Sequence, residues 1–193
     1  YAVRELLSEN ARFRRVLARG LAGGRLVEIK VMQRRYRQTR AEKGHLSNPF
    51  LQELRIASAA GSEFIVRHAE AGTTAGGEHY LVREWLEDGI TAREALVRNV
   101  RLNVPTAASL VLDVALAVER LHQVGYVHRD LRPEKLVVLR RGEAYQGVLT
   151  ELGSIGSIGR TAAGDVVGEF AGISLYMAPE QILDVRAHPS VDI

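Results

Sequence analysis

His128-Arg129-Asp130-Leu131-Arg132-Pro133-Glu134-Lys135 is the stretch that points most directly to the fold of this chain. It is a short polar segment between two apolar runs. The loop therefore supplies a positioned carboxylate, Asp130, and a cation, Lys135. Eight residues match many patterns by accident, so the flanking sequence has to agree before a fold is inferred.

Segments on both sides of this loop do agree with one pattern. Upstream, Val27-Glu28-Ile29-Lys30 is followed by Glu53 in a helical segment. Downstream, Glu151-Leu152-Gly153 precedes a stretch that runs from Gly172 to Ala178-Pro179-Glu180. In order and spacing these segments resemble the V-A-I-K, catalytic-loop, D-F-G and A-P-E motifs of protein kinases over nearly all 193 residues.

The resemblance implies an α+β, bilobal protein-kinase-like fold. We expect an N-lobe with an antiparallel sheet and one helix at residues 1–83, a hinge at 84–89, and a partial, mostly helical C-lobe at 90–193. The chain stops at Ile193, where the family continues through further helices, so we expect a C-terminally truncated fragment of a bacterial-type Ser/Thr kinase-like domain.

The resemblance also assigns roles to individual residues. Asp130 matches the carboxylate that accepts the proton of the substrate hydroxyl, and Arg132 belongs to the same catalytic set. Lys30 matches the cation on the nucleotide phosphates, and Glu53 matches its anchor. Expected nucleotide contacts besides Lys30 are Val16, Glu84, Leu86 and Val137. The cofactors implied are ATP and Mg²⁺.

Two departures from the family pattern affect the metal. Lys135 stands where the family has an Asn ligand, and an ammonium group donates hydrogen bonds but cannot bind a metal. Glu151 replaces the Asp of D-F-G with a longer side chain. Because Mg²⁺ demands near-ideal octahedral geometry, we expect Glu151 to be a weak ligand only.

Three further departures concern the nucleotide and the substrate. The segment from Leu7 to Val16 contains no Gly, so close approach of its backbone to phosphates is lost. Glu28 replaces the small Ala expected over adenine, and burying its carboxylate unpaired is costly. We therefore predict that Glu28 pairs with Lys30 or Arg83. Ile173 lacks the hydroxyl of the usual Thr.

Two functional hypotheses follow. The departures favour a pseudokinase, a kinase fold with impaired catalysis and weak or no nucleotide binding that regulates or scaffolds a protein partner. The alternative is an active, ATP-dependent kinase that phosphorylates protein hydroxyls. Arg132-Pro133-Glu134 is closer to the Ser/Thr than to the tyrosine pattern. The sequence names no activation-loop phosphorylation site among Ser154, Ser157, Thr161 and Ser174, each of which is by default a loop residue.

Composition limits the other functions. No apolar run of about 18 residues could span a bilayer, so we expect no membrane segment. Cysteine is absent, which fits a cytoplasmic protein. The densest basic stretch, between Arg34 and Lys43, suits an acidic or nucleic-acid partner or a solvated loop before a helix. We favour the loop and expect no nucleic acid, because no aromatic platform accompanies the charges.

Periodicity predicts the main elements. Leu26–Met32 alternates as a strand, with Glu28 and Lys30 on one face. A helix begins after the N-cap Asn48 and ends before Gly61. Further strands are expected at 64–67, 79–83, 136–139 and 147–149. A helix at 105–124 carries an apolar stripe at Ala107, Leu110, Val111, Val114, Ala117 and Leu121.

Overall fold

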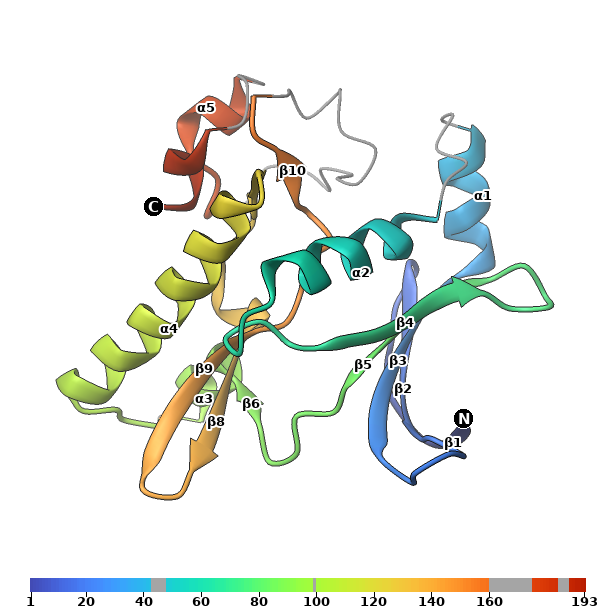
Figure 1. Ribbon diagram of the computed structural model, residues 1–193, viewed down its shortest axis with the longest axis horizontal. Helices are drawn as coiled ribbons and strands as arrows, with labels where there is room; N and C mark the ends of the chain where they lie inside the picture. The colour runs from blue at the N-terminus through green and yellow to red at the C-terminus, as the bar shows by residue number, and fades with distance from the viewer. Residues whose placement is uncertain (43–47, 99, 160–174, 184–187) are drawn as a thin grey trace. The chain divides into compact units, whose positions relative to one another are not determined.

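The computed structural model describes residues 1–42, 48–98, 100–159, 175–183 and 188–193 (Figure 1). These residues form two compact units. Unit 1 comprises Tyr1–Ser58 and Arg67–Trp85, and unit 2 comprises Ala59–Val66 and Leu86–Ile193. The lobe and hinge boundaries expected from the sequence stay a prediction.

Unit 1 is built on a five-stranded antiparallel sheet in the order β1-β2-β3-β5-β4 (Figure 1). Its strands are β1 Ala2–Glu9, β2 Phe13–Arg19, β3 Leu26–Met32, β4 His68–Thr73 and β5 His79–Glu84. β3 has the predicted bounds, and its alternation buries Glu28, Lys30 and Met32 on one face. Register places Glu28 directly opposite Arg83 of β5.

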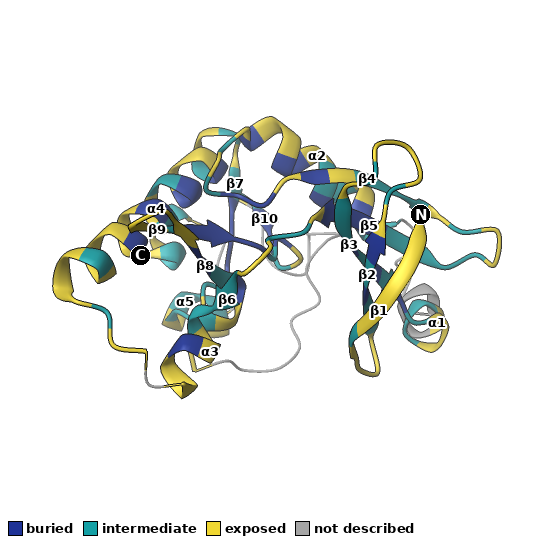
Figure 2. Ribbon diagram, turned by 90° about the horizontal axis from the view of Figure 1, so that it is seen from below, coloured by how far each residue is buried: buried dark blue, intermediate teal, exposed yellow. Residues whose placement is uncertain are grey.

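The edge strand β1 is exposed along nearly its whole length (Figure 2). Two register shifts interrupt its pairing with β2. Such irregularities are a common way to keep an edge strand from pairing with other chains.

Two helices complete unit 1. In α2, Pro49–Ala60, the Asn48 side chain accepts a hydrogen bond from Phe50 N, and Gly61 follows with a φ of 53°, as the cap signals predicted. The expectation of a loop at the basic stretch is wrong, because Arg34–Glu42 forms α1. The ring of Tyr36 packs edge-on against Phe13 at 5.6 Å, which anchors α1.

The strand expected at residues 64–67 is also wrong. Ile65 instead forms an isolated parallel bridge with Leu149 in unit 2, and Val66 N donates to Leu149 O at 2.9 Å. The side chains of Ile65 and Val66 are buried there. The less apolar segment that follows forms β4, because its backbone completes the ladder with β5.

The described residues of unit 2 form two small sheets, one of order β6-β8-β9 and one of order β10-β7. The elements are β6 Ile90–Thr91, α3 Ala92–Val97, α4 Val104–Gln123, β7 Tyr126–Val127, a 3-10 turn Pro133–Lys135, β8 Leu136–Arg141, β9 Ala144–Leu149, β10 Gly156–Ser157, α5 Pro179–Ile182 and a 3-10 turn Pro189–Asp192. β8 and β9 form the expected hairpin, extended by residues on both sides of its turn.

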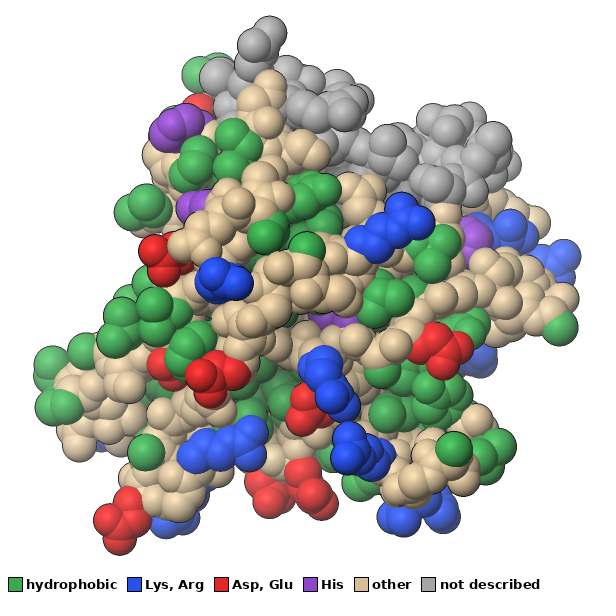
Figure 3. Space-filling view, viewed as in Figure 1, with side chains coloured by type: hydrophobic (Ala, Val, Ile, Leu, Met, Phe, Trp, Pro, Cys, Tyr) green, Lys and Arg blue, Asp and Glu red, His purple; other side chains and the backbone are tan. Residues whose placement is uncertain are grey.

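Helix α4 buries a different stripe from the one predicted. Leu110, Ala117 and Leu121 are buried as expected, whereas Ala107 and Val111 are exposed. The face is turned because the buried Asp113 carboxylate accepts a 2.7 Å hydrogen bond from Gly147 N in β9. Figure 3 shows hydrophobic side chains at the surface over the first half of α4. Within the described ranges, no helix is long and apolar enough to cross a membrane.

Candidate functional site

The catalytic-loop segment of unit 2 is held by Asp192, whose side chain is fully buried. Its carboxylate accepts hydrogen bonds of 2.7 Å from both His128 N and Arg129 N. It also accepts one from His122 Nε2 of α4 at 2.8 Å. Hydrogen bonds to a buried carboxylate are strong and directional, so Asp192 fixes the backbone immediately before Asp130.

Arg129 is held in an unusual backbone conformation. Its φ of 69° lies in the left-handed region, which non-glycine residues seldom occupy. The buried guanidinium packs against Gly156 of β10, where any Cβ atom would overlap it. Gly156 is therefore needed for the close approach that keeps Arg129, and with it the loop, in place.

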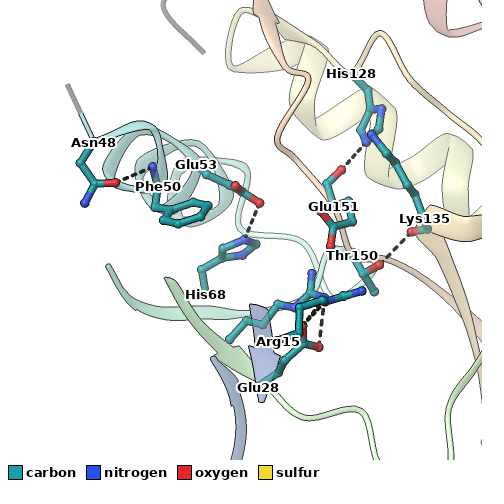
Figure 4. A network of polar contacts seen from close by, with 11 residues as sticks. Arg15, Glu28, Asn48, Phe50, Glu53, His68, His128, Lys135, Thr150 and Glu151 are labelled. Atoms are coloured by element: carbon teal, nitrogen blue, oxygen red, sulfur yellow. Dashed lines mark hydrogen bonds and ion pairs between the residues drawn. The ribbon is translucent and has the colours of Figure 1, made fainter. Parts of the chain in front are cut away.

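His128 is buried and supports the loop from the other side. Its Nε2 donates to the carbonyl of Glu151 at 2.7 Å (Figure 4). Its Nδ1 accepts a hydrogen bond from Asp130 N at 3.3 Å. Burial, followed by the charge of Lys135, lowers the pKa of His128 to about 4. The imidazole is thus neutral near pH 7, with the proton on Nε2.

Asp130 lies between two cations. The ammonium Nζ of Lys135 is 2.5 Å from Asp130 Oδ2, and Arg132 Nε is 3.3 Å from Oδ1. The Lys135 side chain is only 7% exposed. Burial lowers the pKa of Lys135, while its hydrogen bond to Asp130 acts in the opposite direction. Lys135, which stands where the resemblance implies a metal ligand, is therefore a cation paired with Asp130, the carboxylate expected to be catalytic.

The backbone of Lys135 is fixed within this arrangement. Lys135 N donates to Arg132 O, and Lys135 O accepts from both the amide and the hydroxyl of Thr150 at 2.9 and 3.1 Å (Figure 4). The side chain also donates to Ser154 Oγ at 3.3 Å, and Ser154 donates to Asp130 Oδ2 at 3.4 Å. Lys135, Asp130 and Ser154 thus form a closed triangle of polar contacts.

A second charged cluster lies in unit 1, around Glu28. Arg83 Nη2 is 2.9 and 3.0 Å from the two carboxylate oxygens, and Arg15 Nε is 2.6 Å from Oε1 (Figure 4). The Glu28 and Arg83 side chains are 9% and 3% exposed. The prediction that Glu28 pairs with Lys30 or Arg83 is confirmed for Arg83.

Lys30 and Glu53 are buried in the same unit. The Nζ of Lys30 lies 4.6 Å from the ring centroid of Phe13 and 5.7 Å from that of Phe50, within cation–π range. Glu53 Oε1 is 3.4 Å from Nε2 of His68 in β4 (Figure 4). The expected ion pair between Lys30 and Glu53 stays a prediction.

Comparison with known proteins identifies this arrangement. The family model of the protein kinase domain matches residues 16–193. The chain belongs to the protein kinase family. The α+β fold expected from the sequence is thereby confirmed.

The kinase domain is similar to several bacterial Ser/Thr kinases. It is 28% identical over 171 residues to the serine/threonine-protein kinase PknL of Mycobacterium tuberculosis. The matched residues make up 88% of this chain and 40% of PknL. It is 28% identical over 173 residues to serine/threonine-protein kinase pkn2 of Myxococcus xanthus, covering 88% of this chain and 20% of pkn2. The chain thus spans two fifths or less of these relatives.

The residues at the metal position of the kinase domain do not fit the family's Mg²⁺ site. Lys135 places a cation where an oxygen ligand is required, and the charge of the Glu151 carboxylate acts on that cation. The role of Glu151 as a weak ligand stays a prediction. In the part of the chain that the structure describes, no group of three His, Cys, Asp or Glu residues could hold a metal ion.

The predicted adenine contacts are divided between the two units of the kinase domain. In unit 1, Val16 of β2 is buried and Glu84 at the end of β5 is exposed. In unit 2, Leu86 and Val137 pack against one apolar cluster, formed by Val66, Leu139 and Val148. Their role as nucleotide contacts stays a prediction. Ile173, Thr161 and Ser174 lie outside the described residues.

Several residues that shape the site were not singled out from the sequence. Asp192 lies 62 residues after Asp130 in the numbering, and no local pattern links the two. The contact of Arg15 with Glu28 could be recognised only from the pairing of β2 with β3, which places Arg15 opposite Lys30. His68 was missed because the strand was placed four residues too early. The signal that could have found Arg15 is its position on a strand beside the charged face of β3.

Proposed function

We propose that this kinase-fold domain is a catalytically impaired pseudokinase that acts as a regulatory or scaffold module. The observation that carries the proposal is the 2.5 Å ion pair between Lys135 Nζ and Asp130 Oδ2. Phosphoryl transfer needs a carboxylate that receives the substrate hydroxyl and cations that neutralise the phosphates. In this arrangement the cation neutralises the carboxylate itself.

The turn between β1 and β2 supports the same conclusion. In the family, backbone amides of a Gly-rich loop approach the phosphates. Here the amides of Arg12 and Phe13 both donate to Asn10 Oδ1, at 2.8 and 2.9 Å. Asn10 N in turn donates to Phe13 O. Amides that donate to oxygen atoms within the turn are not directed at a ligand, so a source of phosphate affinity is lost.

The charged cluster around Glu28 disfavours binding of the adenine ring. The family places a small apolar side chain over the ring, whereas this chain places a buried carboxylate with two guanidinium partners on that strand face. Inserting an apolar ring beside these groups would desolvate them further. We therefore expect weak nucleotide binding, without dependence on Mg²⁺.

The alternative is an active Ser/Thr protein kinase that uses ATP and Mg²⁺ and phosphorylates protein hydroxyls. It is favoured by the retained Asp130, Lys30 and Glu53 and by the similarity to Ser/Thr kinases. On this alternative, Lys135 would have to leave Asp130 before a substrate hydroxyl could bind there. In both cases we propose a cytoplasmic protein with a protein partner or substrate and no nucleic acid.

Titration of ATP onto the full chain, with and without Mg²⁺, tests the proposal. We expect weak binding that is the same in both conditions, because the metal position holds the Lys135 ammonium. A Lys30→Ala variant serves as the control for binding through the expected phosphate contact. Tight binding that requires Mg²⁺ would favour the active kinase.

A further inference from the structure

Ser154 is a hydroxyl placed between the two charges of the catalytic ion pair. It accepts from Lys135 Nζ at 3.3 Å and donates to Asp130 Oδ2 at 3.4 Å. The neighbouring residues hold it there, since Leu152 and Ile155 are fully buried and Ile155 N donates to Leu152 O. Ser154 itself is partly exposed.

The balance of charge in this triangle depends on the group at Ser154. Lys135 has three N–H donors and contacts the Asp130 carboxylate and one neutral oxygen, Ser154 Oγ. The charge of the Glu151 carboxylate also acts on Lys135, more weakly than that of Asp130. A phosphate on Ser154 would carry about 1.5 to 2 negative charges near neutral pH, more than a carboxylate. It would attract Lys135 and repel Asp130 at the same time.

We propose that Ser154 is a phosphorylation site whose phosphate takes Lys135 away from Asp130. The phosphoryl donor is a nucleoside triphosphate used by a separate protein kinase. The Ser154 Oγ–P bond forms, the bond to the leaving nucleoside diphosphate breaks, and the hydroxyl proton passes to the base of that kinase. This inference rests on the proposed function, because it assigns a regulation to the ion pair that impairs catalysis.

The anchoring of Lys135 limits what the phosphate can change. The Lys135 backbone is bound to Arg132 O and to Thr150, so only its side chain is free to turn. Arg132 contacts the other oxygen of Asp130, Oδ1, and stays with the carboxylate. Phosphorylation therefore leaves Asp130 with Arg132 as its cationic partner and opens Oδ2 to another donor, such as a substrate hydroxyl.

Lysine side-chain NMR tests this inference, because the chain contains only three lysines, Lys30, Lys43 and Lys135. The full chain is prepared with ¹⁵N,¹³C-lysine, and the Lys135 Nζ signal is assigned by Lys135→Arg. Asp130→Asn is then introduced into the unmodified protein and into protein with phosphoserine incorporated at position 154. Phosphoserine at Ser157 provides the same charge three residues further along as a control, and Ser154→Asp serves as a smaller anion.

We expect Asp130→Asn to shift the Lys135 signal in the unmodified protein and in the Ser157 control. With phosphoserine at 154 that shift should be lost, and the Lys135 signal should instead show coupling to phosphorus. If Asp130→Asn shifts the Lys135 signal equally with and without the phosphate, the proposed displacement of Lys135 is wrong, although the ion pair in the unmodified protein is supported. No response in the unmodified protein would overturn both the switch and the contact that carries the proposed function.

Discussion

Replacing Glu28 by Ala should destabilise unit 1 strongly. The substitution removes both contacts of Arg83 Nη2, at 2.9 and 3.0 Å, and leaves a guanidinium that is only 3% exposed. Breaking a buried ion pair by removing one partner costs about 3–5 kcal/mol, because the remaining charge stays buried. The Arg15 contact adds little, since that side chain is 34% exposed and a pair of this kind contributes about 0.2–1 kcal/mol.

Urea unfolding followed by circular dichroism measures the effect. Glu28→Ala should lower the free energy of unfolding by about 3 kcal/mol or more. Glu5→Ala, at an exposed position of the same sheet, should change it by less than about 0.5 kcal/mol. Exchanging both partners, Glu28→Leu with Arg83→Met, should recover most of the loss because neither member of this buried pair remains charged. A loss below about 1 kcal/mol for Glu28→Ala, with Arg83 still buried, would refute the reasoning.

Three further predictions concern the loop, the pH and the nucleotide. Gly156→Ala should displace Arg129 and lower the free energy of unfolding by roughly 1–3 kcal/mol, and an unchanged urea midpoint would show that the loop tolerates the Cβ. Because the pKa of His128 falls from 6.5 to about 4 on folding, stability should be complete above pH 6.5 and fall by roughly 3 kcal/mol as the pH drops to 4; His128→Gln should flatten this part of the profile. The double variant Lys135→Asn with Glu151→Asp should not restore ATP binding, which calorimetry measures. Adding Glu28→Ala to these two changes should restore it. Restoration of ATP binding by the double variant alone would show that Glu28 does not obstruct the nucleotide.

The contacts within regular elements were predictable from the sequence. The period-two alternation of β3 placed Glu28 and Lys30 on one buried face, and β5 was the neighbouring strand, so the pairing of Glu28 with Arg83 followed. The cap signals of Asn48 and Gly61 gave α2 correctly. Such features depend on residues close in the chain or on a single strand pairing.

The features that were missed depend on contacts between distant segments. The apolar pair Ile65 and Val66 has the composition of a strand, but it is buried against the end of β9. Asp113 turned the buried face of α4 because a backbone amide of β9 lies opposite it. Lys135 was recognised as a lost ligand, yet its pairing with Asp130 required the 3-10 turn at Pro133–Lys135, which turns the side chain back toward the loop.

Phosphotransfer by the full-length protein tests the pseudokinase proposal most directly. The protein is incubated with γ-labelled ATP and Mg²⁺, alone and with a generic Ser/Thr acceptor protein, beside an Asp130→Asn variant that removes the expected proton acceptor. We predict no labelled product above the level of the variant, because Lys135 is paired with Asp130 and the metal position holds a cation. Robust labelling that disappears in Asp130→Asn would contradict the proposal and establish an active kinase.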